Sequence, residues 1–160
     1  MGLFARVMFG LVDFAARKGL AESGGETKPP RPESGMQARA TGIRGETYAY
    51  WYLRRQGYIL VARNYKTPGM KGEIDLVGYD GAVVAFVEVK TRTGESEEYG
   101  RPEDAVTPEK RRHLSRMARH FLAERRIPEA QCRFDVLAIE SRPGRRPEVR
   151  LHKGAFSSGG

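Results

Sequence analysis

The dipeptide Asp80-Gly81 limits the fold of this chain more than any other feature of the sequence. It lies between residues 73–79 and residues 82–91, two runs rich in alternating apolar side chains. Such alternation is typical of β-strands, and Asp-Gly between two of them is a strong β-hairpin signal. The sequence therefore predicts an antiparallel strand pair in the middle of the chain.

Acidic side chains gather on this predicted hairpin. Because side chains alternate along a strand, Glu73 and Asp75 share one face, and so do Glu88 and Lys90. If Asp80-Gly81 forms a two-residue loop, Glu73 lies opposite Glu88 and Asp75 lies diagonal to Glu88. We therefore expect two or three carboxylates to converge beside one lysine.

The remaining patterns predict two helices and two or three further strands. Thr41 caps a helix that runs to about Gln56, and residues 58–65 form a strand before the hairpin. Thr107 caps a second helix that Pro108 opens, with an apolar stripe at helical spacing: Leu114, Met117, Ala118, Phe121 and Leu122. Residues 133–140 follow as a buried strand and residues 148–152 as a possible edge strand. The prediction is an α/β fold with a mixed central sheet flanked by helices, in the order α-β-β-β-α-β(-β).

Composition changes along the chain divide it into four parts. Residues 1–21 are expected to form an amphipathic helical extension, and residues 22–40, rich in Gly, Pro and Ser, a disordered linker. The folded domain is expected over residues 41–152, with a flexible tail over residues 153–160.

The net charge favours an anionic partner, and the cysteine content favours a reducing compartment. The formal net charge of +8 favours an anionic partner such as nucleic acid. A single cysteine, Cys132, excludes an internal disulfide and fits a reducing cytoplasm. The longest apolar runs, residues 82–87 and 136–139, are far shorter than the roughly 20 residues of a membrane helix. We therefore expect a cytoplasmic protein without integral membrane association.

The carboxylates on the hairpin have two interpretations. Like charges on opposed strands destabilise a sheet, and a hard divalent cation such as Mg²⁺ would relieve that repulsion. A bound cation would also activate water and neutralise a phosphate, with Lys90 orienting the water or stabilising the transition state. The alternative is an ordinary cross-strand Glu–Lys surface pair.

Each helix adds a candidate residue to this group. Glu46 lies on the small apolar face of the first helix with Gly42, Gly45 and Ala49, and the glycines permit close approach to the sheet. Glu46 is predicted either to reach a shared metal or to pair with an arginine such as Arg63. On the second helix, Lys110 either contacts a phosphate or covers the core, and Arg111 projects from the other edge of the stripe.

Several motifs, in this order, resemble the bacterial YraN-like family of predicted endonucleases over about residues 40–152. They are Gly45-Glu46, Tyr52-Leu53, Gly57-Tyr58, Arg63-Asn64-Tyr65, Gly72-Glu73-Ile74-Asp75, Phe86-Val87-Glu88-Val89-Lys90-Thr91-Arg92, Ala105-Val106-Thr107 with Lys110, and Arg133-Phe134-Asp135-Val136. That family is similar to the PD-(D/E)xK restriction-endonuclease-like superfamily, near the archaeal Holliday-junction resolvases. One departure is that Ile74, and not proline, precedes Asp75.

The resemblance implies a role for each candidate residue. Asp75 and Glu88 would be the metal ligands, Lys90 the catalytic lysine and Glu46 an accessory catalytic acid. Glu73 would support the ligands. Separately from the resemblance, three basic residues are the predicted nucleic-acid contacts: Lys110, Arg111 and Arg92. Resolvase-like enzymes generally work as dimers, so the resemblance also suggests a homodimer.

The expected function is hydrolysis of phosphodiester bonds by a metal-dependent endodeoxyribonuclease with Mg²⁺ or Mn²⁺, in branched or otherwise structured DNA. A non-catalytic nucleic-acid-binding module that retains the nuclease fold is the main alternative. An adaptor whose N-terminal helix docks a partner is a third.

Overall fold

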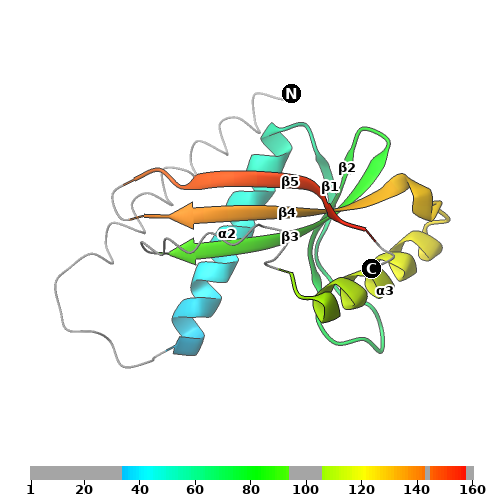
Figure 1. Ribbon diagram of the computed structural model, residues 1–160, viewed down its shortest axis with the longest axis horizontal. Helices are drawn as coiled ribbons and strands as arrows, with labels where there is room; N and C mark the ends of the chain where they lie inside the picture. Colours follow the sequence, from blue (N-terminus) through cyan, green and yellow to red (C-terminus); the bar gives the residue numbers. More distant parts are fainter. Residues whose placement is uncertain (1–33, 94–105, 143–144, 158–160) are drawn as a thin grey trace.

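The fold is a five-stranded mixed sheet flanked by two helices. The computed structural model of the protein describes residues 34–93, 106–142 and 145–157 (Figure 1). Its elements are α2 (Ser34–Arg55), β1 (Ile59–Tyr65), β2 (Ile74–Asp80), β3 (Val83–Thr93), α3 (Pro108–Glu124), the 3-10 helix η2 (Glu129–Gln131), β4 (Cys132–Ser141) and β5 (Glu148–Phe156). The strands lie in the order β1-β2-β3-β4-β5. Only β3 and β4 pair in parallel, and the other neighbours are antiparallel. This confirms the predicted α/β class and element order, and it is the architecture expected of a restriction-endonuclease-like fold.

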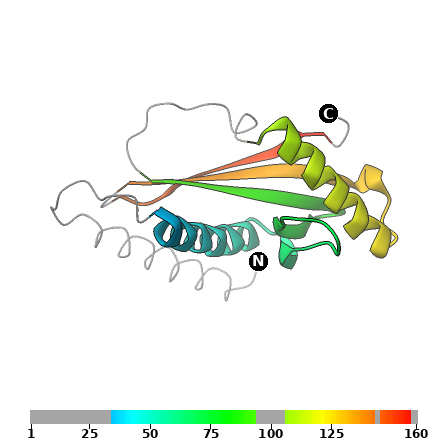
Figure 2. The same cartoon turned by 90° about the horizontal axis from the view of Figure 1, so that it is seen from below.

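Each helix packs on its own apolar cluster. The cluster beneath α2 holds Ala49 and Leu53 with Val87 and Leu137 of the sheet, whereas the cluster beneath α3 holds Phe121 with Phe86 and Phe134 among others. Residues 86 and 87 are adjacent in β3, so their side chains point to opposite faces. The helices therefore cover opposite faces of the sheet: in Figure 2, α2 runs below the long strands and α3 starts above them.

The start of α3 is the one predicted. The Thr107 hydroxyl accepts a hydrogen bond from the Lys110 backbone N–H at 3.2 Å, and Pro108 occupies the first turn. All five residues of the predicted apolar stripe are buried. Because the cap fixes the first turn, it also fixes where the Lys110 side chain leaves the helix.

Two elements extend beyond their predicted bounds. The helix predicted from Thr41 begins at Ser34, so part of the predicted linker is helical. Residues 36–40 (MQARA) are strong helix formers, and the Gly, Pro and Ser residues that suggested a linker mostly precede them. The last strand continues to Phe156 through Gly154, whose φ of 64° belongs to an irregular stretch of the β4–β5 pairing. The predicted helix over residues 1–21, the rest of the linker and residues 158–160 of the predicted tail lie outside the described residues.

The central hairpin forms, but its loop lies one residue later than predicted. Asp80 pairs with Val83, so the loop is Gly81-Ala82, and the positive φ of Gly81 (62°) suits the first loop position of a type II′ turn. The predicted pairing of Glu73 with Glu88 is therefore wrong. Leu76 pairs with Val87, and continuing that register places Asp75 opposite Glu88. A shift of two residues preserves the face of every side chain, so the predicted sharing of faces is unaffected.

The described helices include none that is both long enough and apolar enough to cross a membrane.

Candidate functional site

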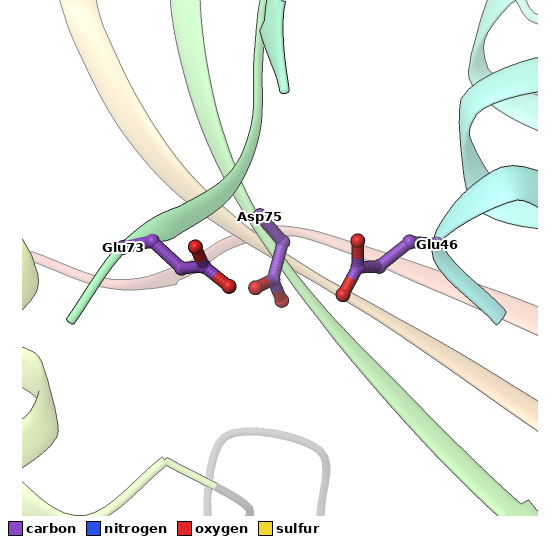
Figure 3. A group of neighbouring side chains, drawn as sticks. All are labelled: Glu46, Glu73 and Asp75. Carbon is purple, nitrogen blue, oxygen red and sulfur yellow. The ribbon is translucent and has the colours of Figure 1, made fainter. Parts of the chain in front are cut away.

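Three carboxylates, one from α2 and two from residues 73–75, meet where β2 begins. Glu46 comes from α2, Glu73 directly precedes β2, and Asp75 is the second residue of β2. Each offers an oxygen, and these oxygens all lie within 4.8 Å of one another. Figure 3 shows Asp75 between the other two side chains. The structure therefore brings together three of the residues that the sequence singled out.

An asparagine of β1 links two of these acids. Asn64 Nδ2 donates to Glu46 Oε2 at 2.9 Å and lies 3.3 Å from Glu73 Oε1, which also accepts from it. The alternative partner proposed for Glu46, Arg63, donates instead to the Thr47 hydroxyl at 3.3 Å. No role for Asn64 followed from its place in the sequence, because a lone asparagine near the end of a strand is an ordinary turn residue.

The pKa of Asp75 lies well above the ordinary value for an aspartate. Burial most of all, then the charge of Glu88 and, more weakly, that of Glu46 raise its pKa, which lies at about 7 instead of an ordinary 3.8. The Val89 backbone N–H donates to Asp75 Oδ2 at 2.7 Å and opposes that rise, as does the charge of Lys110. An acid with such a pKa is only partly ionised at neutral pH, and added positive charge nearby would favour its ionised form.

Glu88 is a buried acid whose carboxylate contacts two lysines. Its side chain is 5% exposed, and its Oε1 lies 3.0 Å from Lys90 Nζ and 3.3 Å from Lys110 Nζ. Its other oxygen, Oε2, is buried and has no hydrogen-bond partner among the described residues. Both lysines are about one-third exposed, at 34% and 37%. Lys110 therefore reaches the site from α3, whereas Lys90 and Glu88 come from the same face of β3.

The other two predicted nucleic-acid contacts, Arg111 and Arg92, belong to the same elements as Lys110 and Lys90, α3 and β3. The contacts of Arg111 include the Val106 carbonyl, to which its Nε donates at 2.9 Å, and the Phe156 ring, whose centroid is 5.5 Å from its guanidinium carbon. Arg92 is exposed on β3, two residues beyond Lys90. Of the predicted residues, six converge: Glu46, Glu73, Asp75, Glu88, Lys90 and Lys110.

The donors in this site fit a hard divalent cation. All are carboxylate oxygens, the class of ligand that Mg²⁺ and Mn²⁺ prefer. Among the described residues, the buried Glu88 Oε2 has no hydrogen-bond partner, and burial, followed by the charge of Glu88, raises the pKa of Asp75. Glu73 is predicted only to support the ligands. Its carboxylate oxygen nevertheless lies within 4.8 Å of an oxygen of Asp75, as that of Glu46 does. Glu46, Glu73, Asp75 and Glu88 are therefore the residues that could hold a metal.

The raised pKa of Asp75 predicts how the stability of the metal-free protein varies with pH. The folded protein holds this proton up to about pH 7, whereas the unfolded chain releases it near pH 3.8. The folded state thus binds more protons between these values, and its free energy of unfolding falls as pH rises through the window. We expect a loss on the order of 4 kcal/mol from this group over the whole window, of which about 3 kcal/mol falls between about pH 5 and about pH 8.

The measurement is urea unfolding in chelator at about pH 5 and about pH 8. Asp75→Asn should remove most of the difference, since the amide does not titrate. An equal pH dependence in both proteins would contradict the burial and charge crowding described for Asp75.

Helix α2 reaches the acid cluster (Glu46, Glu73 and Asp75) because a glycine of the helix, Gly45, faces the sheet. A Cβ added at Gly45 would lie 1.9 Å from Thr91 Oγ1 and 3.1 Å from Thr91 Cβ. This confirms that glycine permits the close approach of the helix. Since Glu46 is the next residue, the separation between α2 and β3 also sets the position of its carboxylate.

Gly45→Ala is therefore expected to push α2 from β3 and move Glu46. Overpacking should destabilise the protein by about 1–3 kcal/mol, although alanine alone would favour the helix by about 1 kcal/mol. A carboxylate displaced by about 1 Å should slow any reaction at the site about 10–100-fold. Thermal unfolding and cleavage rates test this, with Thr91→Ala as the control and Gly45→Ala/Thr91→Ala as the rescue. Gly45→Ala with unchanged stability and rate would show that the helix adjusts freely.

Comparison with known proteins identifies the family. Residues 45–139 match the sequence model of the uncharacterised protein family UPF0102. Among similar proteins, a UPF0102 protein of Koribacter versatilis is 41% identical over 128 residues, covering 79% of this chain and 85% of its own. Another, from Symbiobacterium thermophilum, is 44% identical over 119 residues, covering 74% and 98%. The matched region contains every residue of the acid cluster, and the match confirms the resemblance noted in the sequence. The names of these relatives state no activity or substrate, and family membership together with the fold indicates a nuclease-like protein. The chain therefore belongs to the protein family UPF0102.

Proposed function

We propose that this protein is a metal-dependent endonuclease that hydrolyses phosphodiester bonds in DNA, with branched or otherwise structured DNA as its substrate. The observation that carries the proposal is the convergence of Glu46, Glu73 and Asp75 within 4.8 Å, beside a buried Glu88 that contacts two lysines. The preference for branched DNA rests on the resemblance to the archaeal resolvases.

The charges of the site support a reaction at a phosphate. A DNA phosphate is an anion, and it would be repelled by a bare cluster of acids. Mg²⁺ or Mn²⁺, when bound, supplies positive charge to the phosphate and lowers the pKa of a water molecule. Glu46, Glu73 and Asp75, whose oxygens lie within 4.8 Å of one another, would hold that cation together with Glu88, whose charge acts on Asp75.

The lysines add positive charge that does not depend on the metal. Lys90 and Lys110 meet at one oxygen of Glu88, which holds both ammonium groups at the site. Both remain partly exposed, so each can contact a phosphate oxygen while staying near Glu88. We assign to Lys90 the orientation of the attacking water and the stabilisation of charge on the phosphate in the transition state. Lys110 contacts the phosphate of the bound strand.

Buried acids favour catalysis over binding alone. A module that only binds DNA gains affinity from basic residues, and each carboxylate near the phosphates lowers that affinity. Keeping an acid whose pKa is raised by burial also reduces the stability of the metal-free fold. Both penalties are expected where the acids carry out a reaction.

The test is cleavage of four labelled DNAs: a duplex, a single strand, a flap and a four-way junction. Each is incubated with the wild-type protein in Mg²⁺, in Mn²⁺ or in chelator, and an Asp75→Ala preparation serves as the control for contaminating nucleases. We expect cleavage only with metal, only by the wild type, and fastest on the flap or junction.

Two outcomes would overturn the proposal. The absence of cleavage of every DNA, together with no metal binding by calorimetry, would remove the catalytic interpretation and favour the binding module. Cleavage at equal rates in chelator would exclude the metal dependence.

A further inference from the structure

Asn64 lies at a point where it can organise the acid cluster. Its side-chain nitrogen reaches Glu46 of α2 at 2.9 Å and Glu73 of the segment before β2 at 3.3 Å. Asn64 belongs to β1, so one side chain connects three separate elements. It takes one oxygen of each acid, Glu46 Oε2 and Glu73 Oε1, and the other oxygen of Glu73 faces the exposed Lys66.

The backbone at Asn64 has an uncommon conformation. Its φ is 49°, in the left-handed region that non-glycine residues rarely adopt. Asparagine is one of the residue types that tolerate it. Strained backbone of this kind persists only where surrounding contacts hold it, and it gathers at functional sites. Here the conformation belongs to the residue whose amide reaches both acids.

A neutral donor suits this position chemically. Two carboxylates brought together repel each other, and hydrogen bonds to their charged forms offset that repulsion. A lysine or arginine would do so by adding a positive charge, which would then compete with a metal cation for the same oxygens. The nearby cation, Lys66, stands farther from Glu73, at 3.7 Å from its Oε2, and its side chain is 73% exposed.

We infer that Asn64 is a positioning residue that holds Glu46 and Glu73 ready for the divalent cation and thereby sets the affinity of the site for it. The inference rests on the proposed function, because it concerns the same cation. It adds a residue from β1 to a site otherwise built from α2, β2, β3 and α3. Asn64 acts through the two acids and does not itself contact the reacting atoms.

The decisive variant is Asn64→Gly, which removes the amide while glycine keeps the left-handed backbone without strain. Mn²⁺ affinity is measured by calorimetry on the metal-free full-length protein, with Asp75→Ala as the reference for a lost site. The matched control is Arg126→Gly, because Arg126 has a similar φ of 54° just after α3, sixteen residues beyond Lys110. We expect Asn64→Gly to bind Mn²⁺ about 10–100-fold more weakly and Arg126→Gly to bind it as the wild type does.

Cleavage kinetics provide a second readout that a purely structural role would not change selectively. The Asn64→Gly protein should need about 10–100-fold more Mg²⁺ for half-maximal cleavage and should approach the wild-type rate at saturation. A lower maximal rate with an unchanged Mg²⁺ requirement would overturn the inference.

A measurement on the wild type keeps the test independent of variant folding. The two side-chain amide protons of Asn64 are followed by NMR during addition of Mg²⁺, and their signals should shift with the midpoint that calorimetry gives for Mg²⁺. Signals that stay unchanged at saturating Mg²⁺ would overturn the inference.

The outcomes separate this inference from the proposed function. Wild-type Mn²⁺ affinity in Asn64→Gly, with binding lost in Asp75→Ala, would overturn the role of Asn64 and leave the metal site standing. No Mn²⁺ binding by the wild type would overturn both.

Discussion

Asp75→Ala is expected to slow DNA cleavage by more than about a thousandfold, equivalent to about 4 kcal/mol of transition-state stabilisation. Asp75 lies between Glu46 and Glu73 (Figure 3) and shares its face of the sheet with Glu88. Without Asp75, Glu46 and Glu73 lose the carboxylate that lies between them. DNA affinity without metal should stay equal or rise, because a negative charge near the phosphates is removed.

The experiment compares single-turnover cleavage rates in Mg²⁺ with DNA binding by fluorescence anisotropy in chelator, at one fixed salt concentration. Glu129→Ala is the matched control, since it removes an exposed acid whose side chain is 61% accessible, on η2 before β4. It should cleave at the wild-type rate. Weaker DNA binding by Asp75→Ala, or cleavage at the wild-type rate, would contradict the assignment of the site.

The acids were predictable because their faces depend only on strand parity. Glu73 and Asp75 lie two residues apart, and so do Glu88 and Lys90. The real loop, Gly81-Ala82, shifts the partners by two residues and leaves the faces unchanged. Which acids stand directly opposite each other depends on the turn type, and the local sequence did not fix that detail.

Contacts between distant elements could not be predicted in the same way. The role of Asn64 requires that α2, β1 and the start of β2 meet, and its neighbours in sequence carry no sign of that meeting. The approach of Gly45 to Thr91 was predictable in kind, since glycine on a packing face indicates a close approach. The distance that it allows follows from the packing of the whole helix.

The network around Asp135 was missed for a related reason. The pattern of residues 133–140 predicts a buried strand, and a buried strand gives no information about the partners of an acid within it, such as Asp135. Those partners include Tyr58, 77 residues away in the sequence. Only the assembled sheet shows that Asp135 joins Tyr58, directly before β1, to Gly154 of β5.

Asp135→Ala is expected to lower the free energy of unfolding by about 3–5 kcal/mol. Asp135 is fully buried in β4. Its oxygens accept from Arg133 Nε at 2.9 Å, from the Tyr58 hydroxyl at 3.1 Å and from the Gly154 backbone N–H at 2.9 Å. Burial first, and the charge of Asp135 second, raise the pKa of Tyr58, so its hydroxyl stays protonated and donates. Alanine would leave these three donors without their acceptor inside the protein.

Urea and thermal unfolding measure this loss, with a fall in Tm of about 10 °C or more expected for a domain of this size. Asp135→Asn is the matched variant: it keeps the shape and one acceptor oxygen, so it should lose less stability than alanine.

Mn²⁺ affinity of the folded Asp135→Ala protein should remain that of the wild type. Arg133 also binds Asp80 at the end of β2, and the acid cluster lies at the other end of that strand. A loss of stability below about 1 kcal/mol would mean that Asp135 contributes no more than an ordinary surface ion pair does. A loss of metal affinity in the folded variant would mean that the network also shapes the site. Because opposite ends of one strand serve stability and chemistry, the two properties should be separable by mutation.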